Sequence, residues 1–266
     1  AWVELENGEN WFFHFQDKGV YGRIVHLQPL CWGADGWPQI GQRLNDTGKG
    51  QPVSLHRLPA LPVAPCCLQT SDDFRHGQPG LQWQWQANPQ RHWLTPHQQG
   101  LRLRCALTSG DISLYRLPQL LLQKFPAERF DVQTAVEPMF FQDGDEAGIA
   151  IYGQRFAALC VTYRTANLQL ALCHGWIDDR GETHQQSIGL EEVTGCKEIE
   201  LGFQVDYDGV VHFRYRLAQR EWRQVTPQFS AGAGKWIGAR MGIYARSERE
   251  NVKGSAIFSP FIVRLQ

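Results

Sequence analysis

Residues 199–217, IELGFQVDYDGVVHFRYRL, decide the fold. From Ile199 to Val205 and again from Val211 to Leu217, apolar residues alternate with polar ones. A period of two places every second side chain on one face, which is the pattern of a half-buried β-strand. Strands with one apolar and one polar face are expected where two antiparallel sheets pack together.

The same pattern recurs outward from this stretch, whereas helical periodicity is nearly absent. Short alternating runs bounded by Gly, Pro, Asn and Asp predict strands throughout. The further strands are expected at 11–15, 21–28, 81–86, 101–107, 130–137, 147–152, 156–163, 167–174, 236–245 and 255–265. This number of strands predicts an all-β chain, in which residues 69–266 form an antiparallel jelly-roll β-sandwich of the lectin type.

Residues 1–68 do not continue the strand pattern of the sandwich. Two strands joined by the turn Asp17-Lys18-Gly19 make a hairpin, and a lone hairpin is marginal in water. We therefore expect residues 1–43 to be the last strands of a domain that begins before Ala1. Residues 44–68 are rich in turn residues and proline, which predicts an extended linker.

Composition excludes some classes of partner. The formal charge is −1 with no cluster of Lys and Arg, so neither a nucleic-acid footprint nor a basic membrane patch is expected. No apolar run reaches the length of a membrane span.

The seven cysteines form no CxxC pair and share no zinc-site spacing with histidine. Cys105, Cys160 and Cys173 lie in apolar strand patterns and are predicted to be buried free thiols, which favours a cytoplasmic location.

Tryptophan is abundant, with 10 residues, and aromatic residues make up 12% of the chain. Indole rings stack on sugar rings, but they are also large core side chains. The surplus of aromatic residues favours a carbohydrate as the expected ligand.

Three ordered motifs near the start carry a family resemblance: residues 11–19 (WFFHFQDKG), 21–29 (YGRIVHLQP) and 35–41 (DGWPQIG). They resemble the closing strands of the five-bladed β-propeller of glycoside hydrolase family 43, the β-xylosidases and α-L-arabinofuranosidases. Residues 71–74 (SDDF) and 81–89 (LQWQWQANP) resemble the start of that family's C-terminal concanavalin A-like domain, and 234–239 (GKWIGA) a loop near its end.

The resemblance implies the C-terminal part of an inverting exo-glycosidase acting on xylo-oligosaccharides or arabinose-substituted xylan. In this family the catalytic Asp, Glu and second Asp lie in earlier blades, so no catalytic residue is expected in this chain. The implied partner is the N-terminal propeller portion of the same enzyme, in the same or a separate chain. The sandwich would brace the propeller and partly close its active site.

No other pair of acids in the chain substitutes for the missing set. Inverting hydrolysis needs two carboxyl groups far enough apart to admit a water. The nearest candidates are adjacent acids in polar, turn-like stretches, where solvated turn carboxylates are expected. These are Asp72/Asp73, Asp143/Asp145, Asp178/Asp179 and Glu191/Glu192.

The resemblance also implies which residues contact the sugar. Arg23, after Gly22, matches an arginine that hydrogen-bonds the sugar in the −1 pocket, and a guanidinium suits that role. Gln16 is predicted to line the same region, as is Asp17 unless it serves only the turn. Trp236 matches a loop aromatic that closes the pocket; the alternative is a core tryptophan at the start of a strand. Phe140 and Phe141 are expected in a strand core.

We expect no cofactor and no metal ligand in the chain. Asp72 and Asp73 offer oxygen ligands for a structural calcium, but the last strand lacks acidic partners opposite them. His14 and His26 are predicted to be packed or surface residues. The resemblance places the histidine that holds the family's propeller metal before Ala1.

Two alternatives remain open at this stage. The chain could be a free-standing carbohydrate-binding module with an exposed tryptophan row, for which Trp83, Trp85 and Trp93 are the candidates. It could also serve only as a structural brace for the propeller, which is compatible with the glycosidase hypothesis.

Overall fold

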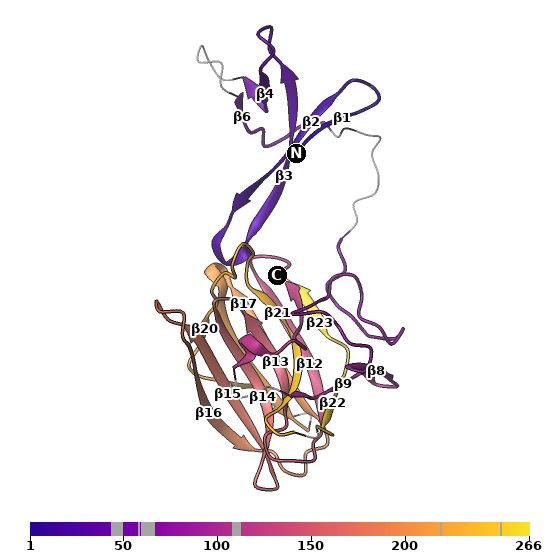
Figure 1. Cartoon of the computed structure of the whole chain (residues 1–266), viewed down its shortest axis with the longest axis vertical. Coiled ribbons are helices and arrows are strands. Elements are labelled where there is room, and N and C mark those ends of the chain that lie inside the picture. Colours follow the sequence, from indigo (N-terminus) through magenta and orange to yellow (C-terminus); the bar gives the residue numbers. More distant parts are fainter. Residues whose placement is uncertain (44–49, 58, 60–66, 108–112, 219, 251) are drawn as a thin grey trace. The chain divides into compact units, whose positions relative to one another are not determined.

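The computed structural model describes residues 1–43, 50–57, 59, 67–107, 113–218, 220–250 and 252–266. The chain divides into two compact units, a first unit of residues 1–18 and 23–68 and a second unit of residues 19–22 and 69–266 (Figure 1). In the described residues the regular structure is strand apart from short 3-10 turns, as the sequence predicts. No helix in that part of the chain is long and apolar enough to cross a membrane.

The first unit is an antiparallel meander. Its strands are hydrogen-bonded in chain order: β1 (Trp2–Glu4), β2 (Asn10–Asp17), β3 (Arg23–Trp32) and β4 (Pro38–Ile40). A short pair, β5 (Gln42–Arg43) and β6 (Gly50–Gln51), follows. The predicted hairpin is thus confirmed, with longer strands than the sequence pattern indicates.

One face of this meander is apolar and exposed. The register places Phe13 opposite Leu27 and Phe15 opposite Val25, so these four side chains share a face. All four are exposed, Val25 to 66%. We call this set the apolar face of the first unit.

The second unit is a sandwich of two sheets. Among the described residues, the first sheet has the order β16-β15-β14-β13-β21-β11-β7, with β10 paired to β21 in parallel. Its strands are β7 (Gln84–Trp85), β10 (Ala106–Leu107), β11 (Leu121–Lys124), β13 (Glu146–Tyr152), β14 (Arg155–Arg164), β15 (Asn167–Ile177), β16 (Thr183–Glu192) and β21 (Arg240–Ser247).

The second sheet has the order β19-β18-β17-β12-β22-β9-β8, with β20 on β18 and β23 on β12. Its strands are β8 (Leu94–His97), β9 (Gly100–Arg104), β12 (Phe130–Met139), β17 (Ile199–Asp206), β18 (Val210–Leu217), β19 (Arg223–Gln224), β20 (Phe229–Ser230), β22 (Ser255–Phe258) and β23 (Ile262–Leu265). The 3-10 turns are η1 (Gly19–Tyr21), η2 (Leu114–Arg116) and η3 (Tyr207–Gly209).

The main core lies between the two sheets, where residues such as Leu159, Leu172, Phe203 and Phe213 are fully buried. A second cluster covers the other face of the first sheet, beneath the segment that contains η2. The centre of the first sheet is therefore buried on both faces, which explains why every residue of β13 is buried.

Several predicted strands need correction. Of the predicted strand 81–86, only Gln84–Trp85 forms, and Leu81 is 103% exposed instead of sharing a buried face. The strand predicted at 236–245 begins at Arg240. The strand predicted at 255–265 is two strands, because Pro260 has no N–H to donate and β12 pairs with β22 and then β23.

Strand β16 has no counterpart in the prediction. Its sequence, Thr183 to Glu192, is largely polar, and it is an edge strand in which no residue is buried. An edge strand with polar side chains is protected from pairing with other chains, and it leaves little apolar alternation to detect.

The predicted linker falls mainly outside the described residues, since 44–49, 58 and 60–66 belong to the part of the chain that is not described. Cys66 also lies there. The domain boundaries at 43/44 and 68/69 remain predictions. Residues 19–22 belong to the second unit, although the sequence assigned them to the propeller remnant.

Candidate functional site

Arg23 is the first residue of β3 and lies opposite Asp17 of β2. Its guanidinium carbon lies 4.4 Å from the centre of the Phe15 ring, in a cation–π arrangement. Arg23 is exposed in the first unit. A guanidinium over an aromatic face still has its N–H donors at its edges, which suits recognition of hydroxyl groups.

Gln16 and Arg23 do not share a face. Gln16 pairs with Ile24, the neighbour of Arg23, and successive side chains in a strand point to opposite faces. Asp17, directly opposite Arg23, is on its face. A shared sugar pocket therefore fits Arg23 and Asp17 better than Arg23 and Gln16, and the role of Gln16 remains a prediction.

Gly22, the residue before Arg23, is held in the second unit by a close backbone contact. Its φ is +77°, and a Cβ there would lie 2.3 Å from the backbone nitrogen of Gly238. The Ala239 N–H donates to the Val20 carbonyl at 2.7 Å. Only glycine permits both this φ and this approach, so the turn 19–22 is docked on the loop that precedes β21.

That loop carries Trp236. It is fixed at its beginning by a hydrogen bond from the Gln154 N–H to the Ala233 carbonyl at 3.0 Å, and at its end by the contact with residues 19–22. Trp236 itself is 69% exposed and has a φ of +69°. The alternative of a core tryptophan that begins a strand is therefore wrong. A bulky residue held at positive φ is strained, and such strain is often found at ligand sites.

Phe140 and Phe141 differ from the prediction of two core residues. Phe140 is half-buried against the main core, as predicted. Phe141 is 65% exposed, because β12 ends at Met139 and the backbone N–H groups of Phe141 and Gln142 turn to bond Asp145.

The predicted solvated carboxylates include two that are buried, Asp72 and Asp145, so the prediction is wrong for both. Asp72 accepts hydrogen bonds from the Phe74 N–H (2.8 Å), the Gly80 N–H (2.8 Å) and the Trp83 indole N–H (2.9 Å). Its oxygens are thus satisfied by donors. This environment does not fit a calcium ligand, which offers its oxygens to the cation.

Asp178 and Glu191 are also held by donors. Asp178 accepts from two backbone N–H groups of its own turn, and Glu191 accepts from the Tyr215 hydroxyl at 2.8 Å. These arrangements are those of structural carboxylates. That the catalytic set lies outside this chain remains a prediction.

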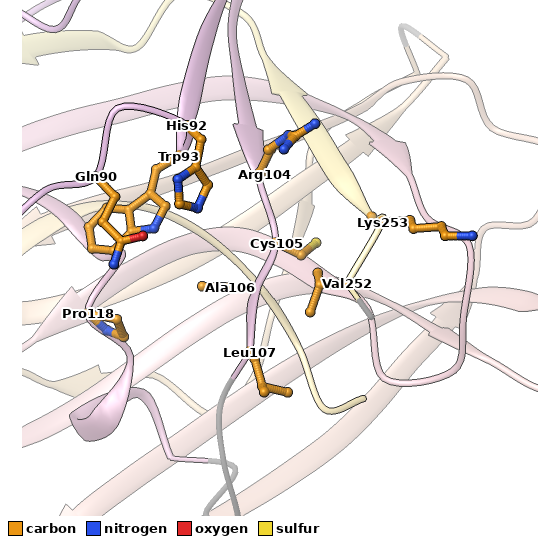
Figure 2. A pocket seen from close by; sticks show the side chains of 11 residues that line it. Gln90, His92, Trp93, Arg104, Cys105, Ala106, Leu107, Pro118, Val252 and Lys253 are labelled. Atoms are coloured by element: carbon orange, nitrogen blue, oxygen red, sulfur yellow. The ribbon is translucent and has the colours of Figure 1, made fainter. Parts of the chain in front are cut away.

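A pocket of about 520 Å3 lies within the second unit. It is formed by the loop before β8, the strand segment 104–107, Pro118 and residues 252–254. Figure 2 shows His92 and Trp93 on one side of that strand segment and Val252 and Lys253 on the other. The sequence patterns gave no sign of this pocket, because its residues come from segments far apart in the chain.

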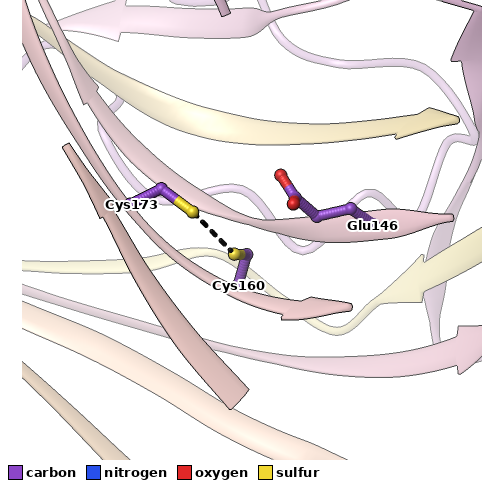
Figure 3. Close-up of side chains that lie close together, drawn as sticks. All are labelled: Glu146, Cys160 and Cys173. Atoms are coloured by element: carbon purple, nitrogen blue, oxygen red, sulfur yellow. Dashed lines mark hydrogen bonds between the residues drawn. The ribbon is translucent and has the colours of Figure 1, made fainter. Parts of the chain in front are cut away.

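Cys160 and Cys173 lie on neighbouring strands, with their sulfur atoms 3.7 Å apart (Figure 3). Both are buried free thiols, as is Cys105, which confirms that prediction. The Glu146 carboxylate is close enough for the three residues to be considered as a metal site. However, Glu146 already accepts two hydrogen bonds from Arg246 (2.8 and 2.9 Å) and one from Tyr244 (2.7 Å), so its charge is neutralised.

A second group of ligand atoms is formed by Asp178, Glu182 and His184 in the β15–β16 hairpin. The imidazole Nε2 of His184 lies 2.9 Å from the Asp178 carboxylate, and its ring stacks on Trp176. The hydrogen bonds and the stack account for this cluster as hairpin structure.

The three tryptophans considered as the row of a free-standing carbohydrate-binding module do not form an exposed row. Trp83 and Trp93 are buried. Trp85 is half-buried and packs edge-on against Trp93, with ring centres 5.3 Å apart. These three residues therefore offer no flat platform for a sugar chain.

Comparison with known proteins gives the same architecture. Residues 71–264 match the model of a family described as the β-xylosidase C-terminal concanavalin A-like domain of glycoside hydrolase family 43. Curated relatives include a provisionally named β-xylosidase of Xylanibacter ruminicola, 28% identical over 91% of this chain and 43% of that protein. A β-xylosidase of Formosa agariphila is 24% identical over 94% of this chain and 45% of that protein.

Solved structures share the fold. The xylan β-1,4-xylosidase of Bacillus halodurans C-125 has a TM-score of 0.79 and 20% identity, covering 99% of this chain and 52% of its own. An engineered family 43 hydrolase with endo-xylanase and exo-arabinofuranosidase activity has a TM-score of 0.80 and 21% identity, covering 100% of this chain and 54% of its own. This chain spans less than half the length of the two curated relatives, 43% and 45%.

Proposed function

We propose, from the premise that this chain belongs to the family of the β-xylosidase C-terminal concanavalin A-like domain, that it is the C-terminal part of an inverting exo-glycosidase. The substrates would be xylo-oligosaccharides or arabinose-substituted xylan. The observation that carries the proposal is the family match over 71–264, joined to a preceding four-stranded meander whose apolar face is exposed.

The first unit would be one blade of a propeller. A four-stranded antiparallel meander is the unit from which propellers are built, and blades pack face to face. Exposed apolar patches mark interaction sites. The partner that fits Phe13, Phe15, Val25 and Leu27 is the N-terminal propeller portion, either in the same chain or as a separate one.

Arg23 would hydrogen-bond the sugar that is cleaved. Its guanidinium lies over the Phe15 ring, and its side chain is exposed at the surface of the first unit. Trp236 would limit the pocket to the end of a sugar chain. Its exposure and positive φ support a role beyond packing.

Reconstitution tests the proposal. The chain is fused to, or co-expressed with, a matching propeller portion, and hydrolysis of 4-nitrophenyl β-D-xyloside and 4-nitrophenyl α-L-arabinofuranoside is measured. Activity is expected only when both parts are present. A folded fusion without activity on either substrate would contradict the proposal.

Within the reconstituted enzyme, R23Q is expected to lower kcat/KM by about ten- to a hundredfold, the value of one or two hydrogen bonds to a charged donor. R180Q, which changes an exposed arginine in the β15–β16 turn, is the matched control and should leave kcat/KM unchanged. Equal kcat/KM for R23Q and R180Q would remove Arg23 from the sugar site.

A further inference from the structure

Three basic side chains line the pocket of about 520 Å3 in the second unit. His92, Arg104 and Lys253 line it, and no Asp or Glu is among its lining residues. Neither Arg104 nor Lys253 forms an ion pair with any acid in the described part of the chain. Both are exposed, so their charges remain available to an anion.

Cys105 lies in the middle of the pocket lining, where its thiol is uncharged and its backbone is held by hydrogen bonds. Burial and the nearby charge of Asp145 raise the pKa of the Cys105 thiol well above its ordinary value, so the thiol carries no charge that would repel an anion. Two hydrogen bonds hold the backbone of Arg104 and Cys105. The Arg104 N–H donates to the Trp93 carbonyl at 2.8 Å, and the Cys105 N–H donates to the Gly254 carbonyl at 2.9 Å.

The remaining lining is amphipathic. Val252 supplies apolar surface, His92 supplies an exposed imidazole ring, and Gln90 supplies an amide with both a donor and an acceptor (Figure 2). The volume of about 520 Å3 lies in the range of pockets for small ligands. Cationic groups beside an imidazole ring and an amide suit a ligand that has a carboxylate attached to a hydroxylated ring.

We propose that this pocket binds an acidic sugar unit, a carboxylate carried on a saccharide, at a site of its own in the sandwich. Arg104 and Lys253 would hold the carboxylate, while His92 and Gln90 would contact the ring. The choice of a saccharide over other carboxylates rests on the proposed function. The site itself does not, because it is formed by residues of the second unit alone.

The test is a binding titration of the full chain at low ionic strength, by calorimetry or by NMR. Three ligands are compared: D-glucuronate, the neutral sugar D-xylose and the free anion acetate. Saturable binding is expected for D-glucuronate, with at least about tenfold weaker binding for each of the other two, since each lacks one half of the recognised group. Added salt should weaken D-glucuronate binding.

Variants locate the site. The double variant R104Q/K253Q is expected to weaken D-glucuronate binding by at least about tenfold, which corresponds to one lost charge-assisted contact. The control R180Q/K197Q removes the same charge from exposed positions elsewhere in the second unit and should bind as the parent does. Unchanged thermal midpoints verify that both variants are folded.

Three results would overturn the proposal. Without saturable D-glucuronate binding there is no site. Equal weakening in R104Q/K253Q and R180Q/K197Q would mean a general charge effect. Acetate binding as tight as D-glucuronate binding would show a site for a free anion and not for a sugar acid. Because no hydrolysis is measured, these outcomes are independent of the reconstitution experiment.

Discussion

Arg246 and Glu146 form an ion pair in the sandwich interior, with side-chain exposures of 2% and 4%. Removing one partner leaves the other charge buried and unpaired, which is strongly destabilising. E146Q is therefore expected to lower the free energy of unfolding by about 3–5 kcal/mol, measured by denaturant titration. The control E200Q removes a carboxylate from the more exposed Glu200–Arg216 pair and should change it little.

The same pair predicts a pH dependence. Burial on its own raises the pKa of Glu146, but the charge of Arg246 and the hydrogen bonds from Arg246 and Tyr244 bring this pKa below its ordinary value. A carboxyl whose pKa is lowered by folding stabilises the protein above its unfolded pKa of about 4.3, and this contribution is lost as the pH falls through the folded value. The stability difference between the parent and E146Q should therefore shrink below about pH 4. A difference that is constant from pH 7 to pH 3 would contradict this.

A second prediction for a single residue concerns the effect of G22A on stability. G22A combines a positive φ, which costs an L-residue about 1 kcal/mol or more, with a Cβ that overlaps the backbone of Gly238. G181A is the matched control, because Gly181 has a φ of +81° but no atom within 4 Å of its would-be Cβ. G22A should lower the thermal midpoint clearly more than G181A does. Equal shifts would mean that the turn 19–22 is not docked on the loop before β21.

At the scale of elements, Asp72 organises the segment that leads into the sandwich. The Asp72 N–H donates to the Phe261 carbonyl at 2.9 Å, and the Phe261 N–H donates to the Asp72 carbonyl at 2.8 Å. The Asp72 carboxylate accepts hydrogen bonds from the N–H groups of Phe74 and Gly80 and from the Trp83 indole. The sequence predicted a strand at 81–86 from its alternation. The indole hydrogen bond of Trp83 to Asp72 instead bends this segment, and Leu81 is left in solvent.

D72A is expected to destabilise the second unit by about 2–4 kcal/mol, because several buried N–H donors lose their acceptor. D73A is the neighbouring control. Asp73 is largely exposed, and among the described residues it contacts the side chain and the backbone N–H of Arg75. The change in the free energy of unfolding in D73A should therefore be within experimental error. Hydrogen exchange of the Trp83 indole N–H reports the local effect. Unchanged exchange in D72A would show that Asp72 does not hold this segment.

Strand prediction succeeded where burial is one-sided or complete and failed where other forces dominate. β17 and β18 follow their alternating pattern because one face of each meets the core. β16 gives no such signal, since an edge strand with polar side chains buries little. Trp236 could not be assigned from its spacing, because the loop is set by contacts with residues 20–22 that are distant in sequence.

For the whole molecule, the sequence motifs identified the family, and they identified Arg23 and Trp236 as candidates. The pocket around Arg104 lay beyond such reasoning, because it exists only once four segments of the sandwich are folded together. The sequence predicted that the hairpin belongs to a larger domain, but the apolar face itself emerged only from the register of β2 and β3. Folding within this chain buries neither Val25 nor Phe15.

That face gives the last prediction. V25D/L27D should leave the fold of the chain intact, because both side chains are already exposed, and thermal unfolding should be nearly unchanged. In a complex with a propeller portion, two carboxylates would be buried without partners, at a cost of several kcal/mol. Co-purification with the propeller portion should therefore fall at least about a hundredfold. The control I188D places a charge at an exposed apolar position of β16 and should co-purify like the parent. Equal co-purification of V25D/L27D and I188D would mean that the propeller portion does not cover this face.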